Sequence, residues 1–549
     1  MKKLILILLL LCFSEKLIKA QESNNLVSQS KLVEDTRYLA KILEESHPEP
    51  YQNFGGRIAF NRGLQEILLS IPAAGMVKSE YYNKIMPFVA KLCDMHTGLV
   101  NEEKASSNAA GLPLQLKIIE QYLVVTGVES DEYKSLLGAK LISIEGISLK
   151  ELRIRQTRLR GIENEYGEFA FLTRSLKTSN GLKNLIPEWK TTEKISVEFK
   201  LKSGKKSNVN FQIGKLKTGN GISFDSKIIK PSTERSDVAF GFLDGKKETA
   251  LLIVSNMERY REASEAWFSS GMQGAADYSG IAYKYFNKTD PPADKEKLLK
   301  GIPSATETFI SLVKEINNAR TKNLIIDLRE NTGGNSLMKE MLVYFLFGKS
   351  GLLKINSGFQ IKKYSDLYFN NFSSDSLAVI NKNLSIMLTK NDYDFMDERG
   401  AKNLSSRNSE KLKEYDEYFK KSPTFWNVYK TGDYDNPNNK IKNIIILCSP
   451  FTVSSGFNML TSLCDNGAKI VGVPSAQPGN NFGDVLFFQL PNTGIKGYVS
   501  FKLNVTFPDD PVKGKCLMPD YMLTYKIFAG MNFDPEAEII WALELLKKN

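Results

Sequence analysis

Two short segments of the sequence place chemically useful residues directly after runs of branched apolar residues. Residues 324–327 are followed by Leu-Arg-Glu-Asn-Thr and then by Gly333 and Gly334. Residues 444–447 are followed by Cys-Ser-Pro-Phe-Thr-Val and then by Ser454 and Ser455. A serine where a buried strand meets a helix exposes its hydroxyl beside backbone N–H groups, which suits a nucleophile with an oxyanion site. Taken alone, such a serine is more often a helix N-cap, and a double glycine is at least as often a tight turn.

Together the two segments resemble the C-terminal processing (tail-specific) serine peptidases and their tricorn-core relatives. Those proteins carry an Asp-x-Arg-x-Asn-x-Gly-Gly strand end and, later in the chain, a Thr-x-Ser-x-x turn, and both patterns occur here in that order. The resemblance implies Ser454 as the nucleophile, with Ser455 next in line if the register shifts by one. It implies oxyanion donors at the N–H groups of Ser455 and of Gly333 or Gly334. It also implies a ClpP/crotonase-like α/β core that needs no metal or organic cofactor.

The group that activates the serine differs between branches of this family. Some members use a lysine in a glycine-rich run after the nucleophile, but Pro478 stands at that place here. Lys469 is the only lysine between Ser454 and Pro478. Other members, including the tricorn core and the chlamydial protease-like activity factor, use a histidine in an N-terminal Asp-x-His-Thr. This chain has Asp94-Met-His-Thr, and imidazole suits proton transfer near neutral pH. We therefore expect His96 to be the general base, and we interpret the other histidine, His47, as structural.

A histidine base works best when a third group orients it and stabilises its charged form. The histidine-using relatives place a glutamate shortly before a Pro-Asp pair, and Pro519-Asp520 would put Lys513 at that position. Asp509 and Asp510 lie slightly upstream, and we assign the role to Asp510. The mismatch leaves open that the third member is absent.

The elements that must position these residues follow from periodicity. Apolar residues at helical spacing predict a helix over 32–43 that stops at His47-Pro48, with further helices over 60–71 and 79–92, so residues 25–108 form a helical N-terminal cap carrying His96. Residues 109–220 are rich in strand patterns, and residues 138–152 resemble the strand, turn and helix of a PDZ domain. A plain β spacer is the alternative. Such domains bind extended peptides at a sheet edge.

From residue 237 to 549, strands such as 250–254, 324–327 and 444–447 alternate with helical segments, which predicts an α/β core around a largely parallel sheet. Two polar and aromatic excursions, at about 257–303 and 350–438, interrupt this pattern and are expected to be insertions. The fold class expected overall is multi-domain α/β, with the cap and the inserted PDZ-like β domain placed before the catalytic core.

Residues 1–20 have the layout of a signal peptide, with Met-Lys-Lys, an apolar run over 4–13 and Ala20 before the expected cleavage point. The run is about half the roughly 20 residues that span a bilayer. We expect an exported protein, periplasmic or secreted, without an integral membrane segment after cleavage. The net charge of +11 comes from basic residues that are scattered and often beside acids, which argues against a nucleic-acid groove. The expected partner is a peptide or protein substrate, and a homo-oligomer is left open.

The leading hypothesis is an exported serine peptidase that hydrolyses peptide bonds through an acyl-enzyme on Ser454. A catalytically impaired peptide-binding protein on the same scaffold is the alternative, because the family's glutamate is missing and Gly456-Phe457 replaces the usual Ser-Glu. A hydrolase acting on another ester or amide is a third candidate, since the acyl-transfer groups do not select the substrate.

Overall fold

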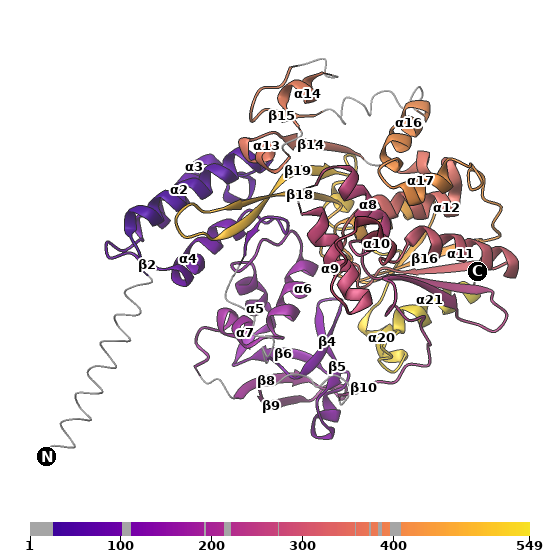
Figure 1. The fold of residues 1–549 in the computed structure, drawn as a ribbon. Coiled ribbons are helices and arrows are strands. Elements are labelled where there is room, and N and C mark those ends of the chain that lie inside the picture. The colour runs from indigo at the N-terminus through magenta and orange to yellow at the C-terminus, as the bar shows by residue number, and fades with distance from the viewer. Residues whose placement is uncertain are drawn as a thin grey trace, which may run out of the picture.

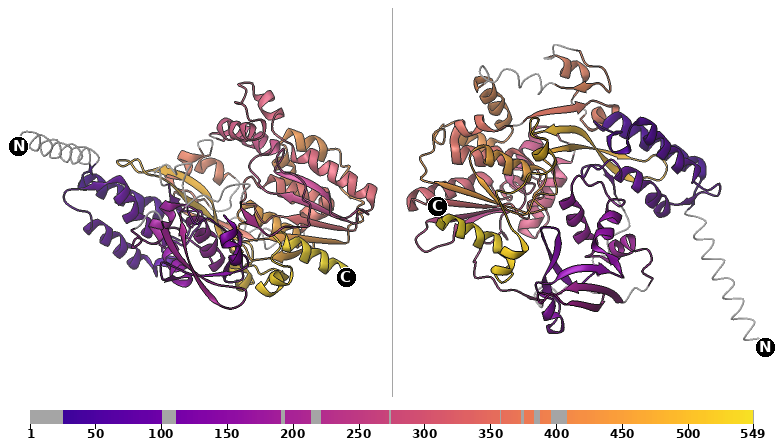
Figure 2. Two further views of the ribbon diagram at one scale, coloured as in Figure 1. Left: turned by 90° about the horizontal axis from the view of Figure 1, so that it is seen from below. Right: turned by 180° about the vertical axis from the view of Figure 1, so that it is seen from behind.

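The computed structural model describes residues 26–100, 111–190, 194–213, 221–272, 274–356, 358–372, 375–382, 387–395 and 408–548. The predicted leader at residues 1–20 lies outside this part of the chain. Figure 1 shows an N-terminal group of helices, a β domain and a larger α/β core, and Figure 2 shows the N-terminal helices and the core at opposite ends of the molecule. Within the described ranges, no helix has the length and apolarity needed to cross a membrane.

The N-terminal group consists of three helices, α2 (Gln29–Ser46), α3 (Arg57–Leu69) and α4 (Lys78–Ala90). Helix α2 ends at Ser46, because His47 precedes Pro48 and takes the extended backbone conformation that a following proline favours. Helix α4 continues through Pro87 for three residues. The apolar faces of the three helices share one buried cluster that includes Leu39, Phe60 and Ile85. A short pair of strands, β1 (Leu26–Val27) and β2 (Met76–Val77), joins their ends.

The β domain is an antiparallel sheet in which β5 pairs with β4 along one edge and with β10 and β6 along the other, and β8 and β9 follow β6. Its strands are β4 (Leu114–Ile119), β5 (Tyr122–Val128), β6 (Lys140–Ile144), β7 (Ile147–Ser148), β8 (Lys194–Lys200), β9 (Lys206–Gln212) and β10 (Ile222–Ser223). Three helices interrupt the strands that the sequence predicted here: α5 (Leu149–Gln156), α6 (Glu165–Ser175) and α7 (Ser179–Leu185). Asn164 and Thr178 cap the second and third of them.

The core sheet has the order β11-β12-β13-β16-β17-β20 and is parallel from β12 to β20. Its strands are β11 (Val238–Phe242), β12 (Thr249–Val254), β13 (Asn323–Asp327), β16 (Asn443–Cys448), β17 (Lys469–Gly472) and β20 (Tyr521–Met522). One face is covered by α11 (Ala305–Ala319), α12 (Leu337–Lys354) and α18 (Ser455–Asp465), and the other by α21 (Ala537–Lys548). Both faces are buried, which is why the central strands read as continuous apolar runs.

A second sheet joins the core to the N-terminal helices. Strands β18 (Asn480–Gln489) and β19 (Lys496–Val505) form a long hairpin that reaches from the core to α2 (Figure 1). Strand β14 (Phe359–Lys363) pairs with β19 on the side away from the hairpin turn, followed by β15 (Tyr393–Asp394), and β3 (Gly98–Leu99) also pairs with β19. Leu486 and Val499 of the hairpin are fully buried in the cluster of the N-terminal helices. The hairpin therefore holds the loop that carries His96 against the core.

The two excursions fold into further elements. Residues 257–303 contain α8 (Arg261–Ser269), α9 (Ala275–Asn287) and α10 (Lys295–Lys300). The described part of residues 350–438 supplies strands β14 and β15 together with α13 (Asp366–Asn371), α14 (Leu377–Asn381), α16 (Asn408–Phe419) and α17 (Pro423–Tyr429). The remaining helices, α19 (Pro511–Lys515) and α20 (Tyr525–Gly530), flank β20.

Candidate active site

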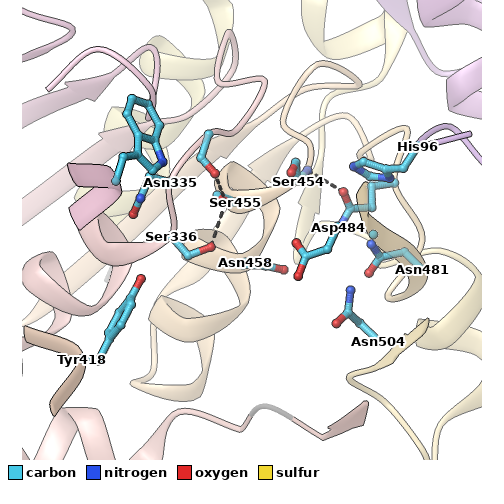
Figure 3. A pocket seen from close by; sticks show the side chains of 14 residues that line it. His96, Asn335, Ser336, Tyr418, Ser454, Ser455, Asn458, Asn481, Asp484 and Asn504 are labelled. Atoms are coloured by element: carbon cyan, nitrogen blue, oxygen red, sulfur yellow. Dashed lines mark hydrogen bonds between the residues drawn. The ribbon is translucent and has the colours of Figure 1, made fainter. Parts of the chain in front are cut away.

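A pocket of about 300 Å³ opens where the carboxyl ends of β13 and β16 meet the hairpin β18–β19 and the loop before β3. Figure 3 shows Ser454 and His96 on one side of it, with Asp484 and Asn481 beside them, and Ser336 and Tyr418 across from them. The excursions reach the pocket through Trp267 of α8 and Tyr418 of α16. Most of the exposed lining is polar, and it comes from segments far apart in the sequence.

Ser454 stands between β16 and α18 with a backbone that residues other than glycine rarely adopt. Its φ is +55° and its ψ is −131°, and its side chain makes no capping hydrogen bond to α18. Its N–H donates to the side-chain oxygen of Gln477. Backbone strain of this kind persists only where the surrounding structure imposes it, and it clusters at functional sites. The N-cap interpretation of this serine therefore does not describe the site.

Ser455 is the serine whose hydroxyl is engaged in the structure. Its Oγ donates to the Gly334 carbonyl at 2.6 Å, lies 2.8 Å from Ser336 Oγ, and the residue is buried. Its N–H belongs to the first turn of α18, where no carbonyl of the same helix can accept it. Ser454 thus offers the hydroxyl, and Ser455 offers a backbone donor beside it.

The double glycine lies directly against Ser454. A Cβ on Gly333 would stand 2.5 Å from Ser454 Cβ, so only glycine fits this approach. The Gly333 N–H donates to Asn331 Oδ1 at 2.9 Å, which leaves the Gly334 N–H to act with that of Ser455 toward a reacting carbonyl oxygen. Gly334 also lines the pocket, whereas Gly333 does not.

Gly333→Ala is expected to lower kcat/KM about 10²- to 10³-fold, the usual effect of losing an oxyanion donor, because the methyl group must push the Gly333–Gly334 turn away from Ser454. Gly467→Ala is the matched control. Gly467 has φ +95° against +97° at Gly333, but an added Cβ there would meet nothing within 4 Å. Equal losses of activity in the two variants would show that backbone strain, and not the approach to Ser454, is responsible.

The polar residues before the double glycine build the strand end and do not line the pocket. Arg329 donates to Asp327 at 2.9 and 2.6 Å, to Glu536 at 2.5 Å and to Glu538 at 2.8 Å. Asn331 donates to the Val254 carbonyl at 2.9 Å. Burial alone would raise the pKa values of the three carboxyl groups, but Arg329, with Lys117 at Glu538 and Lys230 at Glu536, holds them below their usual range.

Arg329→Met is expected to reduce the free energy of unfolding at pH 7 by about 3–5 kcal/mol, because it leaves buried carboxylates without their main partner. Since their pKa values are lowered in the folded protein, their stabilising effect is present above about pH 4 and is lost as the pH falls below it. The gap in unfolding free energy between wild type and variant, measured by urea denaturation, should therefore narrow as the pH falls below about 4. Arg155→Met, at a pair with exposed Glu188, is the control and should cost far less, because solvent screens an exposed ion pair. A gap that stays constant with pH would refute this account.

His96 reaches the pocket from the loop between α4 and β3, and Asp94 holds that loop in place. Asp94 Oδ1 accepts the His96 N–H at 2.8 Å, and its Oδ2 accepts the Thr97 hydroxyl at 2.5 Å. The Thr97 hydroxyl in turn accepts the Ser500 N–H of β19 at 3.0 Å. His47 Nε2 lies 3.3 Å from Asp94 Oδ2. Burial would raise the pKa of Asp94, but His47, His96 and Thr97 lower it, so Asp94 is ionised.

Asp510, which we predicted to orient His96, is the N-cap residue of α19 in the structure. Its carboxylate caps α19 by accepting the Lys513 N–H at 3.0 Å, and it pairs with Lys513 Nζ at 3.3 Å. It does not line the pocket. Asp510 is close in sequence to the family's glutamate position. Its carboxylate nevertheless points to the N-terminus of α19, because it caps that helix.

Gln477 is a pocket residue that the sequence analysis did not select. It lies one residue before Pro478, in the run where relatives carry their lysine, and its Oε1 accepts the Ser454 N–H. Its Nε2 is buried, lines the pocket region and has no hydrogen-bond partner in the described structure. The run over residues 472–479 could have indicated Gln477, because it stands where relatives carry a site residue. Pro478 occupies the lysine position itself, and Gln477 precedes it.

Comparisons with known proteins agree with this geometry. Residues 281–496 match the model of peptidase family S41, a range that includes both strand ends and Ser454. No curated protein matches the chain in sequence. The structure of mature CPAF complexed with lactacystin matches with 14% identity, 95% coverage of this chain, 99% coverage of that chain and a TM-score of 0.55, which shows a shared fold.

Two further solved structures match with lower scores. The photosystem II D1 C-terminal processing protease has 11% identity, covers 91% of this chain and 94% of its own, and gives a TM-score of 0.38. A putative S41 protease from Bacteroides fragilis NCTC 9343 has 10% identity, covers 93% of this chain and 97% of its own, and gives a TM-score of 0.37. Residues 281–496 therefore carry a peptidase family S41 domain, which supports a serine peptidase.

Proposed function

Starting from the peptidase family S41 domain, we propose that this chain cleaves peptide bonds with Ser454 as nucleophile and His96 as general base. The observation that carries the proposal is the strained backbone of Ser454, which presents its hydroxyl to a pocket that His96 also lines. Ser454 Oγ attacks the scissile carbonyl carbon, and its proton passes to His96. The C–N bond then breaks, and the leaving amine takes that proton.

The Ser455 and Gly334 N–H groups support the negative charge that develops on the carbonyl oxygen. A water molecule deprotonated by His96 then attacks the acyl carbon, and the ester bond to Ser454 Oγ breaks. Oγ takes the proton back from His96 as the acid product leaves. His96 Nδ1 is buried, so Nε2 is the nitrogen available to the pocket. Of the described residues that line the pocket, none is a lysine, which supports the histidine branch over the Ser-Lys branch.

The test is covalent labelling with a fluorophosphonate, followed by cleavage of a peptide library and of simple esters. We expect wild type to be labelled at Ser454 and to cleave peptides. Labelling without peptide cleavage but with ester hydrolysis would favour a hydrolase of another class. Folded wild type that neither labels nor cleaves would favour a peptide-binding protein.

Export is a separate part of the proposal and rests on the leader pattern at residues 1–20. N-terminal sequencing of the protein from its native cells should begin at Gln21. A mature chain that still begins at Met1 would contradict export through a cleaved signal peptide.

A further inference from the structure

We propose that Glu163 is the residue that positions His96. The sequence pattern had assigned this role to Asp510, near the C-terminus. Glu163 lies in the linker between α5 and α6 of the β domain, 67 positions after His96 in the numbering. The inference deepens the proposed function and rests on it, since positioning matters only if His96 acts as the base.

The geometry of two buried atoms carries the inference. His96 Nδ1 and Glu163 Oε2 are both buried, and neither has a hydrogen-bond partner in the described structure. His96, Glu163 and Asp94 each offer a side-chain atom that lies within 4.8 Å of the other two. A buried polar atom without a hydrogen-bond partner destabilises the folded protein. A hydrogen bond from His96 Nδ1 to Glu163 Oε2 would satisfy both atoms. Glu163 Oε1 already accepts the Phe482 N–H at 3.3 Å, which leaves Oε2 for His96.

The linker is tied closely to both halves of the site. A Cβ on Gly161 would lie 2.2 Å from the Asp94 carbonyl oxygen, so this glycine allows the linker to touch the His96 loop. Arg160 donates to the Met95 carbonyl at 3.4 Å. On the other side, Asn164 donates to the Ser475 carbonyl at 3.0 Å, two residues before Gln477. These contacts hold Glu163 between the base and the loop from β17 to β18, which carries Gln477.

Asp94 is the other carboxylate close to His96, and its existing hydrogen bonds exclude it from orienting the imidazole. Both of its oxygens are engaged, with the His96 N–H, the Thr97 hydroxyl and His47, so it fixes the backbone of the loop and leaves the imidazole to Glu163. The same bonds argue against a metal ion at Asp94, His96 and Glu163. Asp94 would have to give up these partners, and only two free ligand atoms would remain.

The burial of Glu163 makes it a group that needs a hydrogen-bond donor beside it. Burial, and then the charge of Asp94, raise the pKa of Glu163 well above its usual value. Such a carboxyl group is costly to ionise without a hydrogen-bond donor, and an N–H at His96 Nδ1 would supply one. Once ionised, Glu163 stabilises the imidazolium that forms when Nε2 takes the serine proton. The charged and titratable groups that face His96 are Glu163, Asp94, His47, Arg160 and Asp484, the last paired with Lys502.

Glu163→Gln tests the inference, with Glu165→Gln as the matched control two residues away, where the side chain is partly exposed beside Arg153. We expect E163Q to lower kcat of peptide cleavage about 10³- to 10⁴-fold, the effect of losing the orienting acid in a triad. The acid limb of its kcat/KM profile should move to lower pH, because the imidazolium loses its neighbouring anion. Glu163→Asp, which keeps the charge, should recover part of kcat, and E165Q should behave as wild type.

The outcomes separate this inference from the proposed function. If wild type is not labelled at Ser454, the proposed function fails. If wild type is labelled and E163Q matches E165Q in kcat and pH profile, the positioning role is wrong. If E163Q does not fold, E163D decides instead, and full wild-type kcat in E163D overturns the inference because the shorter side chain cannot keep the same contact. A shifted acid limb in Asp484→Asn but not in E163Q would assign the role to Asp484.

Discussion

Ser454→Ala is expected to abolish fluorophosphonate labelling and to lower kcat about 10⁶-fold, as loss of the nucleophile does in serine peptidases. The physical reason is that no other hydroxyl stands in its place: the neighbouring Ser455 hydroxyl is held by the Gly334 carbonyl and Ser336. Intact-mass spectrometry of the labelled protein and peptide cleavage rates measure the effect. Binding of peptide should persist, since the backbone donors remain.

Ser455→Ala is the matched control for this prediction. The variant removes a hydroxyl that holds Gly334 in place, so we expect a loss of activity far smaller than that of S454A, with labelling retained. If S455A loses the label and S454A keeps it, the nucleophile is Ser455 and not Ser454. Melting temperatures of both variants distinguish lost chemistry from lost folding.

His96→Gln is the second large effect, and we expect kcat to fall about 10⁴- to 10⁶-fold without loss of substrate binding. Glutamine cannot take a proton from Ser454 near neutral pH, but it has nearly the shape of histidine and keeps the backbone bond to Asp94. Single-turnover cleavage of a peptide and the rate of fluorophosphonate labelling check this expectation.

His47→Gln separates a base from a structural histidine. His47 is fully buried and lies 3.3 Å from Asp94, outside the pocket lining. We expect H47Q to lower the melting temperature and to reduce activity far less than H96Q at a temperature where both are folded. A folded H96Q that is labelled at the wild-type rate would contradict the assignment of the base, and equal losses in kcat would show that both histidines act through the Asp94 loop.

The site is assembled from segments that lie far apart in the sequence. Ser454 and the double glycine come from the core, His96 from the N-terminal helices, and Glu163 from the linker of the β domain. The hairpin β18–β19 and its pairing with β3 bring these parts together. Substitutions that weaken the contact between the hairpin and the N-terminal helices are therefore expected to act on catalysis, although they lie far from Ser454.

The local chemistry of the two strand ends could be predicted from the sequence. A buried parallel strand is a continuous apolar run, and the glycines and hydroxyl residues that follow it must lie at the carboxyl edge of the sheet. The same reasoning predicted a helical stop at His47-Pro48, since proline limits a helix without help from tertiary contacts. These features depend on residues that are neighbours in the sequence, and for that reason they can be predicted from the sequence alone.

Only the tertiary structure decided which atoms face the pocket. Ser454 and Ser455 are adjacent residues of one type. They differ because only the Ser455 hydroxyl makes long-range hydrogen bonds, to the Gly334 carbonyl and to Ser336. Asp510 was chosen by its distance along the chain, whereas a helix cap turns it away. Glu163 has no local signal at all, because its proximity to His96 comes from the contact of Gly161 with Asp94. Sequence patterns record the backbone's local preferences, while the partner of a buried side chain is set by segments that meet only in the folded protein.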